Sequence, residues 1–455
     1  MTQLHTLTIT SAAERIRDLE LSPTSLLRAC SDRITELDPK LQAWVTIDYE
    51  GALLAAANAE KEIKEGHYRG PLHGIPVGIK DIFFTEGIAT GMGSSLYSDY
   101  VPTYDATTIR LLKQAGAIIV GKTHTTEFAA LAPSPTRNPW NLRYTPGGSS
   151  SGSAAAVSGQ MCFGALGSQT YGSTLRPASY CGCVGFKPTF GRISTYGVYP
   201  LAGSLDHVGL FSRSVADSAL LLQVLAGEDA EDPTSSTQEV PDYSRALHNS
   251  RPPKLGILRE FFVENASLET QKNFQATIDR LKQAGANLID LSLPTSFERA
   301  PQAHFDMMFV ESAFSHRKNY ELHKQEYSPQ MQNLIESGRK ITAVEYLATQ
   351  HHQQLFRQEM NALCDSVDAL ITPATPAPAP KGFATTGDPS FNGPATFSGL
   401  PSLGLPSGVS ESGLPFGLQL MAGTFAEPKL LRAGAWCENV LAFSGAPAFL
   451  YTRDD

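Results

Sequence analysis

The sequence has little positive charge and no long apolar run, and each absence excludes a class of protein. Lys and Arg number 36 against 45 Asp and Glu, which gives a formal net charge of −9 over 455 residues. No basic cluster of the kind that binds phosphates occurs, so we expect no nucleic-acid surface. No run of about 18 apolar residues is present, and the N-terminus lacks a basic segment followed by an apolar core. We therefore expect neither a membrane span nor an exported protein.

Cysteine is also scarce, and the six cysteines are scattered: Cys30, Cys162, Cys181, Cys183, Cys364 and Cys437. The close pair Cys181 and Cys183 has neither the spacing of a CxxC redox motif nor that of a zinc ribbon. His351 and His352 are adjacent, whereas two zinc ligands on one helix face stand four residues apart. The sequence therefore indicates a reducing, cytoplasmic location, and we expect no metal site and no cofactor.

The apolar residues that are present predict alternating helices and strands. Their spacing predicts amphipathic helices over residues 22–37 and 49–65, the first behind a serine cap and a proline. Residues 71–81 then contain a short apolar run bounded by Gly and Pro, which is typical of a buried strand. Lys80 and Asp81 come at the end of this strand.

The hexamer LKQAGA occurs at residues 112–117 and again at 281–286. At both places a helix ends at a glycine and an apolar strand follows, which is half of a βαβ unit. Two copies are too few to indicate a repeat protein. Residues 301–366 are predicted to be mostly helical, and the Gly- and Pro-rich residues 392–423 are predicted to form short strands at a sheet edge. We expect one large α/β domain over residues 1–455, with a parallel or mixed sheet covered by helices and a helical insertion near 301–366.

The segment TPGGSSSGSAAAV, residues 145–157, combines glycines and hydroxyls with almost no large side chain. It lacks the lysine or the GxGxxG pattern of a phosphate loop, and its GSSSG is only a weak match to a nucleophile elbow, because Gly/Ser-rich loops produce that pattern by chance. A second such cluster follows at 166–182, and Lys80 ends a strand upstream. Burial among backbone and hydroxyl groups lowers the pKa of a lysine, so that Lys80 could act as a base.

Three segments in this order, GIKD (78–81), PGGSSSGSAAAV (146–157) and GSQTYGSTLRPASYCG (167–182), resemble the amidase signature family of serine hydrolases. The two key serines, Ser149 and Ser173, are 24 residues apart, as in that family. The resemblance extends from about residue 20 to residue 423, which is nearly the whole chain. Three separated motifs make this a specific signal.

The resemblance implies the family's α/β fold, in which a central mixed sheet is covered by helices on both faces, and a Ser-cisSer-Lys triad. Ser173 would be the nucleophile, and Lys80 would take its proton through Ser149, which would follow a cis peptide bond at Gly148. Backbone amides across Thr170, Tyr171, Gly172 and Ser173 would form the oxyanion hole. The implied substrate is a small molecule with a carboxamide or a urea-like C–N bond. The family also implies a homodimer, with a small partner subunit in some members.

The sequence departs from the family around the nucleophile. Many members have DTGGS where this chain has QTYGS at residues 169–173. Gln169, together with Arg176 three residues after the nucleophile, resembles a variant subgroup, and both are candidate substrate-binding residues. Arg176 would bind a substrate carboxylate or pair structurally with a buried acid. Tyr171 stands where a glycine is expected, so it would either form a wall of the acyl pocket or distort the loop and abolish catalysis.

Three functions therefore stay open. The first is a hydrolase that acts on a linear amide. The second is a glutaminase-type amidotransferase subunit that works with a partner, although that subunit has the DTGGS pattern that this chain lacks. The third is a catalytically silent scaffold, for which Tyr171 is the support.

Overall fold

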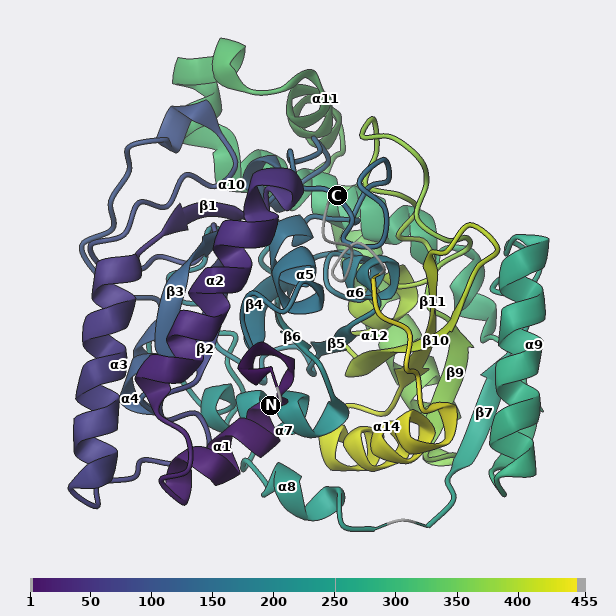
Figure 1. Cartoon of the computed structure of the whole chain (residues 1–455). Helices are drawn as coiled ribbons and strands as arrows, with labels where there is room; N and C mark the ends of the chain where they lie inside the picture. Colours follow the sequence, from purple (N-terminus) through teal and green to yellow (C-terminus); the bar gives the residue numbers. More distant parts are fainter. Residues whose placement is uncertain (1–2, 250, 448–455) are drawn as a thin grey trace.

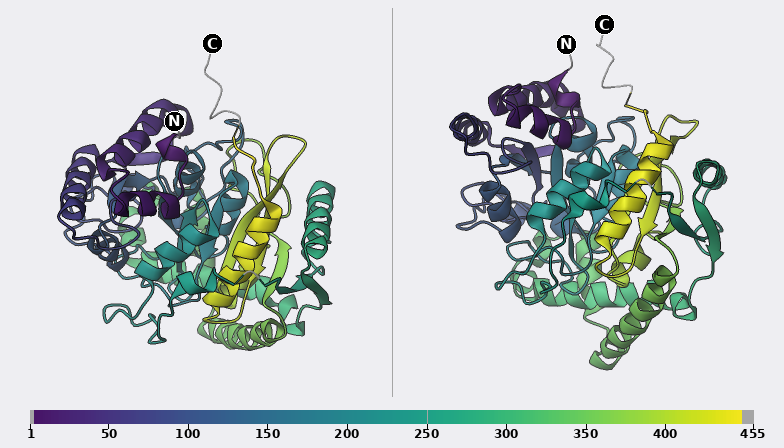
Figure 2. Two further views of the ribbon diagram at one scale, coloured as in Figure 1. Left: turned by 60° about the horizontal axis from the view of Figure 1, so that its bottom comes forward. Right: turned by 90° about the horizontal axis from the view of Figure 1, so that it is seen from below.

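A computed structural model describes residues 3–249 and 251–447, and its ribbon is shown in Figures 1 and 2. The expected domain limits at residues 1 and 455 lie outside the described residues. One sheet of 11 strands runs through the molecule in the order β1-β3-β2-β4-β6-β5-β10-β11-β9-β7-β8. Its strands are β1 (Trp44–Ile47), β2 (Pro76–Lys80), β3 (Ile118–Thr123), β4 (Gly164–Gln169), β5 (Val184–Lys187), β6 (His207–Ser212), β7 (Lys254–Leu258), β8 (Asn287–Leu291), β9 (Ala369–Pro373), β10 (Ser402–Val409) and β11 (Pro415–Met421). The sheet is mixed, because β2 runs parallel to β3 and β4 whereas β4 runs antiparallel to β6.

Helices cover both faces of this sheet, as predicted. They are α1 (Ile9–Arg17), α2 (Pro23–Leu41), α3 (Tyr49–Lys64), α4 (Thr107–Gln114), α5 (Ser151–Ser158), α6 (Leu175–Cys181), α7 (Val215–Leu225), α8 (Tyr243–Ala246), α9 (Leu268–Gln283), α10 (Ala300–His323), α11 (Pro329–Gly338), α12 (Ala343–Asp365), α13 (Gly393–Phe397) and α14 (Glu427–Leu441). Strand β10 shows the two faces, since successive side chains of a strand point to opposite sides. Leu403 lies against Gly434 of α14, whereas Gly404 faces Leu175 of α6. The central strands are thus buried between helices.

The predicted helices near the N-terminus are confirmed. Helix α2 begins after Ser22, whose side chain accepts a hydrogen bond from the amide of Ser25, with Pro23 in the first turn. Helix α3 covers the predicted span 49–65 almost completely. The predicted insertion consists of α10, α11 and α12; in Figure 1, α11 lies at the top and α12 lies on the far side of the sheet.

Both LKQAGA hexamers form the predicted helix-to-strand junction. They connect α4 to β3 and α9 to β8. The glycines at the junctions, Gly116 and Gly285, have φ of 78° and 104°, which side chains disfavour. The two units lie toward opposite ends of the sheet, so the hexamer forms the same local helix-to-strand turn at two independent places.

Residues 392–423 contain the predicted strands, β10 and β11, but the prediction that they lie at a sheet edge is wrong. Strand β10 lies between β5 and β11, and β11 lies between β10 and β9, all in the interior of the sheet. The prolines do not prevent this placement, because Pro415 begins its strand and Pro406 adjoins a shift of register next to Gly408. At such places a missing N–H removes little of the ladder of hydrogen bonds.

Candidate active site

The candidate site lies where two parallel central strands end. Lys80 is the last residue of β2 and Gln169 the last of β4, and the two strands pair side by side. Because the carboxyl ends of parallel strands meet at one edge of a sheet, these segments, which are far apart in the sequence, converge there. Ser149 stands just before α5, which packs against both strands with side chains no larger than valine.

Lys80 is completely buried and forms hydrogen bonds with two serine hydroxyls. Its Nζ lies 2.7 Å from Oγ of Ser149 and 2.7 Å from Oγ of Ser168. Burial lowers the pKa of this lysine well below its ordinary value, and the nearby carboxylate of Asp206 opposes that shift. The neutral amine is thereby favoured, as a proton acceptor requires.

Ser168 is a site residue that the sequence analysis missed. It belongs to the second Gly/Ser cluster, directly before the QTYGS segment, but its neighbours contain several other hydroxyls. Only its position near the end of β4, beside β2, selects it as a partner of Lys80.

Ser149 follows a cis peptide bond with Gly148, as the family resemblance implied. Ser149 does not cap α5, because the N-cap of that helix is Ser150. The Ser149 carbonyl accepts a hydrogen bond from the amide of Thr126, while its hydroxyl faces Lys80.

The guanidinium of Arg176 donates to backbone carbonyls and not to a carboxylate of the described residues. Its Nη2 donates to the carbonyl of Gly148 at 2.5 Å, and its Nη1 donates to the carbonyl of Gly387 at 2.7 Å. It is buried, and burial lowers its pKa to about 10. No carboxylate of the described residues forms an ion pair with it, so the expected pairing with a buried acid is wrong. The guanidinium instead connects two backbone segments, the carbonyl just before Ser149 and the carbonyl of Gly387.

Gln169 is also engaged within the protein. Its Oε1 accepts from the amides of Thr174 at 2.8 Å and Leu175 at 3.0 Å, and its Nε2 donates to Oγ1 of Thr396 at 2.9 Å. The side chain is fully buried. Its oxygen is therefore committed to the two residues that follow Ser173, and its nitrogen is committed to Thr396 on α13.

Tyr171 does not strain this loop. Among the described residues the non-glycine positions with positive φ do not include it, so the backbone here does not require a glycine. Its ring packs against the rings of His304, with centroids 4.4 Å apart, and Phe305, at 5.1 Å. A Cβ on Gly393 would lie 2.3 Å from the Tyr171 ring, so that glycine leaves the space that the tyrosine fills. The ring is thus held between α10 and α13.

Ser173 lies in the turn between β4 and α6 and is 7% exposed. In the part of the chain that the structure describes, no hydrogen bond has the amide of Tyr171, Gly172 or Ser173 as its donor. These three consecutive amides are therefore available to an oxyanion next to the serine.

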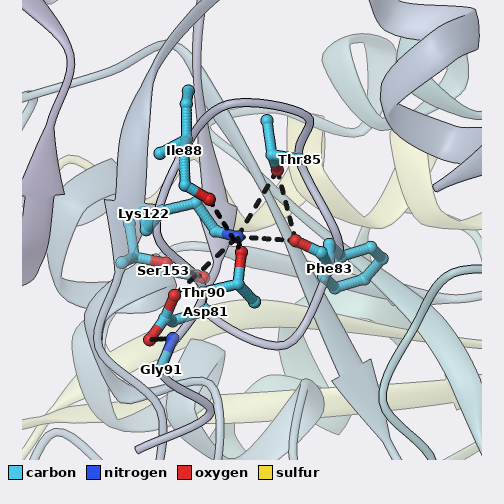
Figure 3. Close-up of polar contacts among 9 residues, drawn as sticks. Asp81, Phe83, Thr85, Ile88, Thr90, Gly91, Lys122 and Ser153 are labelled. Atoms are coloured by element: carbon cyan, nitrogen blue, oxygen red, sulfur yellow. Dashed lines mark hydrogen bonds and ion pairs between the residues drawn. The ribbon is translucent and has the colours of Figure 1, made fainter. Parts of the chain in front are cut away.

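A second polar network surrounds the amine of Lys122 on β3 and the carboxylate of Asp81, which directly follows β2 (Figure 3). There the amine of Lys122 donates to the carbonyl of Phe83 at 2.5 Å and to Oγ1 of Thr90 at 2.7 Å, and it lies 3.7 Å from a carboxylate oxygen of Asp81. Burial raises the pKa of Asp81 and lowers that of Lys122, and the charge of each group opposes the shift of the other. Asp81 and His124 also line a cavity of about 610 Å³. This network fixes the chain directly after Lys80.

Neither a metal cluster nor a membrane-spanning helix is found in residues 3–249 and 251–447. No three His, Cys, Asp or Glu side chains there gather as metal ligands would. No helix in the same part is long and apolar enough to cross a membrane. All six cysteines are buried and unpaired.

Comparison with known proteins agrees with this geometry. The family model of the amidases matches residues 25–431. A subunit of the glutamyl-tRNA(Gln) amidotransferase of Geobacter metallireducens is 38% identical, over 97% of this chain and 98% of that protein. The corresponding protein of Myxococcus xanthus, which has the same name, is also 38% identical, over 94% and 96% of the two chains.

Solved structures give the same picture. The peptide amidase of Stenotrophomonas maltophilia is 29% identical and superimposes with a TM-score of 0.86, over 98% of this chain and 99% of that one. A chain from a protein complex related to an s-triazine catabolic enzyme is 28% identical with a TM-score of 0.90, over 97% and 99%. The 6-aminohexanoate cyclic dimer hydrolase is 25% identical with a TM-score of 0.88, over 99% and 100%.

Proposed function

The chain belongs to the amidase family, and from this premise we propose that it cleaves an amide bond with Ser173 as nucleophile, Ser149 as proton relay and Lys80 as base. The observation that carries the proposal is the buried amine of Lys80, 2.7 Å from the hydroxyl of Ser149. Such an amine is favoured in its neutral form and can accept a proton, whereas an exposed lysine at neutral pH cannot.

The reaction would proceed through an acyl-enzyme. Oγ of Ser173 attacks the amide carbonyl and loses its proton through Ser149 to Lys80. The negative charge that develops on the carbonyl oxygen is stabilised by the free amides of residues 171–173. Lys80 then returns the proton through Ser149 to the leaving nitrogen, the C–N bond breaks, and water hydrolyses the ester on Ser173 by the reverse relay.

The arrangement of Tyr171 argues against the scaffold function. The scaffold hypothesis required the ring to distort the loop, but the backbone avoids positive φ and the ring lies in a space left by Gly393. The same ring adds bulk beside the oxyanion loop, and we expect it to restrict the acyl group to small substrates.

The second candidate, an amidotransferase subunit, gains support from the relatives. Two relatives that are 38% identical over nearly their whole length are named as one subunit of an amidotransferase, and a protein so named works within a complex. In such a role the amide would be a primary carboxamide, and the leaving group would be ammonia for use by a partner. The QTYGS segment at 169–173 still distinguishes this chain from the pattern expected of that subunit. Both functions share the chemistry proposed for Ser173.

One experiment tests the shared chemistry without a known substrate. The purified protein is treated with a fluorophosphonate probe, and the labelled peptide is identified by mass spectrometry. We expect labelling of Ser173 in the native protein, and at least a hundredfold slower labelling in Lys80→Ala and Ser149→Ala. Ser158→Ala is the control, because that hydroxyl donates to the carbonyl of Cys181 and has no part in the relay. A folded protein that is not labelled at Ser173 would refute the proposal.

A second experiment separates the two candidates. Ammonia release is measured from L-glutamine and from a panel of primary and secondary amides, with the protein alone and after co-purification from its host. Turnover of small amides by the protein alone supports the independent hydrolase. Ammonia release from glutamine that depends on a co-purified partner supports the amidotransferase role. Light scattering of the same preparation tests the predicted homodimer.

A further inference from the structure

Three consecutive carbonyl groups of the nucleophile loop are held by donors from different elements. The carbonyl of Thr170 lies 2.8 Å from Nε2 of His304 on α10. The carbonyl of Tyr171 accepts from Oγ1 of Thr396 on α13, also at 2.8 Å. The carbonyl of Gly172 accepts from the backbone amide four residues later, at 3.1 Å. Only the last of these bonds is local in the sequence.

These bonds fix the direction of the neighbouring amides. The peptide bonds concerned are trans, and in a trans peptide the N–H points away from the C=O of the same unit. The bond from His304 therefore turns the amide of Tyr171 away from α10, and the bond from Thr396 turns the amide of Gly172 away from α13. These are two of the amides that donate no hydrogen bond within the described residues.

We propose that His304 and Thr396 are positioning residues that orient the oxyanion-binding amides of Tyr171 and Gly172 from outside the active site. The inference rests on the proposed function, since it assigns a purpose to those amides. Neither side chain touches the reacting atoms, and each acts through one backbone carbonyl. Oxyanion stabilisation depends on donors that are already oriented before charge develops, so a loosened carbonyl lowers the rate rather than the binding of the ground state.

The protonation state of His304 is the one that this role requires. A carbonyl can only accept, so the proton must be on Nε2. The backbone of Gly393 also lies beside the ring, and together with the carbonyl of Thr170 it opposes the effect of burial on the pKa. The ring is buried, and burial lowers its pKa to about 4. The imidazole is thus neutral at ordinary pH, with a single N–H that is directed at Thr170.

The direction of the Thr396 hydroxyl proton is in turn determined by a hydrogen bond from Gln169. Its hydroxyl has one proton, and Oγ1 accepts from Nε2 of Gln169, so that proton is free for the carbonyl of Tyr171. A second acceptor, the carbonyl of Asn392, lies farther away at 3.2 Å. A carboxylate at position 169 could only accept, and it would draw the hydroxyl proton to itself. Because its amide group donates to Thr396, Gln169 leaves the hydroxyl proton of that threonine for the carbonyl of Tyr171, which a carboxylate at position 169 would not do.

The test is the rate at which a fluorophosphonate labels Ser173. Its oxygen attacks phosphorus, an O–P bond forms, the P–F bond breaks, and fluoride leaves while the proton passes to Lys80. The phosphoryl oxygen gains negative charge during attack, so the maximal rate reports on the oxyanion amides. The concentration for half-maximal rate reports on reversible binding.

We expect His304→Leu, Thr396→Val and Gln169→Glu each to lower the maximal labelling rate about tenfold with half-saturation unchanged within twofold. His304→Gln, which keeps an N–H donor, should recover part of the loss. The matched controls are His316→Leu, a histidine buried on the same helix that faces Tyr327, and Thr349→Val, a buried threonine bonded within α12. Both controls should be labelled within twofold of the native rate.

Each possible result either supports or overturns the positioning role of His304 and Thr396. Native labelling rates in folded His304→Leu and Thr396→Val would overturn the inference, as would an equal loss in the two controls. Should His304→Leu fail to fold, Thr396→Val and Gln169→Glu decide alone, since they change few atoms. Labelling of the native protein at Ser173 with no effect of these variants would remove the positioning role and leave the proposed function intact, whereas a native protein that is not labelled would remove both.

Discussion

Replacing Tyr171 by glycine would restore the residue expected in the family, and we predict that it damages this protein. The ring is largely buried against His304 and Phe305. Removing a large aromatic side chain from such a place costs about 3 kcal/mol, at the lower end because the ring is partly exposed. A glycine adds about 1 kcal/mol of backbone entropy, since the native φ here gives it no advantage. The free energy of unfolding should fall by about 4 kcal/mol.

The same substitution should slow the chemistry. The ring packs beside the segment whose amides we propose as the oxyanion site, and its loss also leaves His304 without its nearest aromatic neighbour. We expect fluorophosphonate labelling of Ser173 to fall about tenfold in Tyr171→Gly. Tyr171→Phe is the matched control, because no described hydrogen bond involves the phenol group and the ring would stay.

Urea unfolding monitored by fluorescence, together with labelling kinetics, measures both effects. A Tyr171→Gly protein that is as stable as the native one and is labelled as fast or faster would refute this reasoning. That result would mean that the tyrosine obstructs the site and that the packing on α10 contributes nothing to the loop.

Three further predictions concern the lysine, the arginine and pH. Lys80→Arg should lose labelling as completely as Lys80→Ala, by at least a hundredfold, because arginine stays protonated; a partly active Lys80→Arg would mean that charge rather than proton transfer matters. Arg176→Lys has one amine where the guanidinium reached two carbonyls, so labelling should fall about tenfold, and unchanged kinetics would exclude a role in holding Gly148. Burial lowers the pKa of His304 from 6.5 to about 4, so between these two pH values the folded protein binds fewer protons than the unfolded chain. As the pH falls from 6.5 to 4, this residue should therefore lower the free energy of unfolding by up to about 3 kcal/mol. Unfolding titrations at pH 4.5–7 should therefore give a shallower pH dependence in His304→Leu than in the native protein, and equal slopes would refute the assignment.

Local sequence determined much of this protein, because the causes are local. The serine cap and the first-turn proline of α2 are adjacent residues, and the apolar spacing of α3 repeats within one helix. The helix-to-strand junctions at LKQAGA need only a glycine at the turn. Lys80, Ser149 and Ser173 could be named because their motifs have a recognisable order, and the structure places the first two in hydrogen-bond contact. The nucleophilic role of Ser173 stays a prediction.

Tertiary structure decided what the motifs could not. Thr170 and His304 are 134 positions apart, and Tyr171 and Thr396 are 225 apart, so no local pattern pairs them. Such partners are selected by how helices pack on the sheet, which depends on the whole chain. The interior position of β10 and β11 has the same origin, since strand order follows from long-range pairing and a proline count describes only local preference. The effect of Tyr171 likewise depends on a space left by Gly393, a residue that is remote in the sequence and adjacent in the fold.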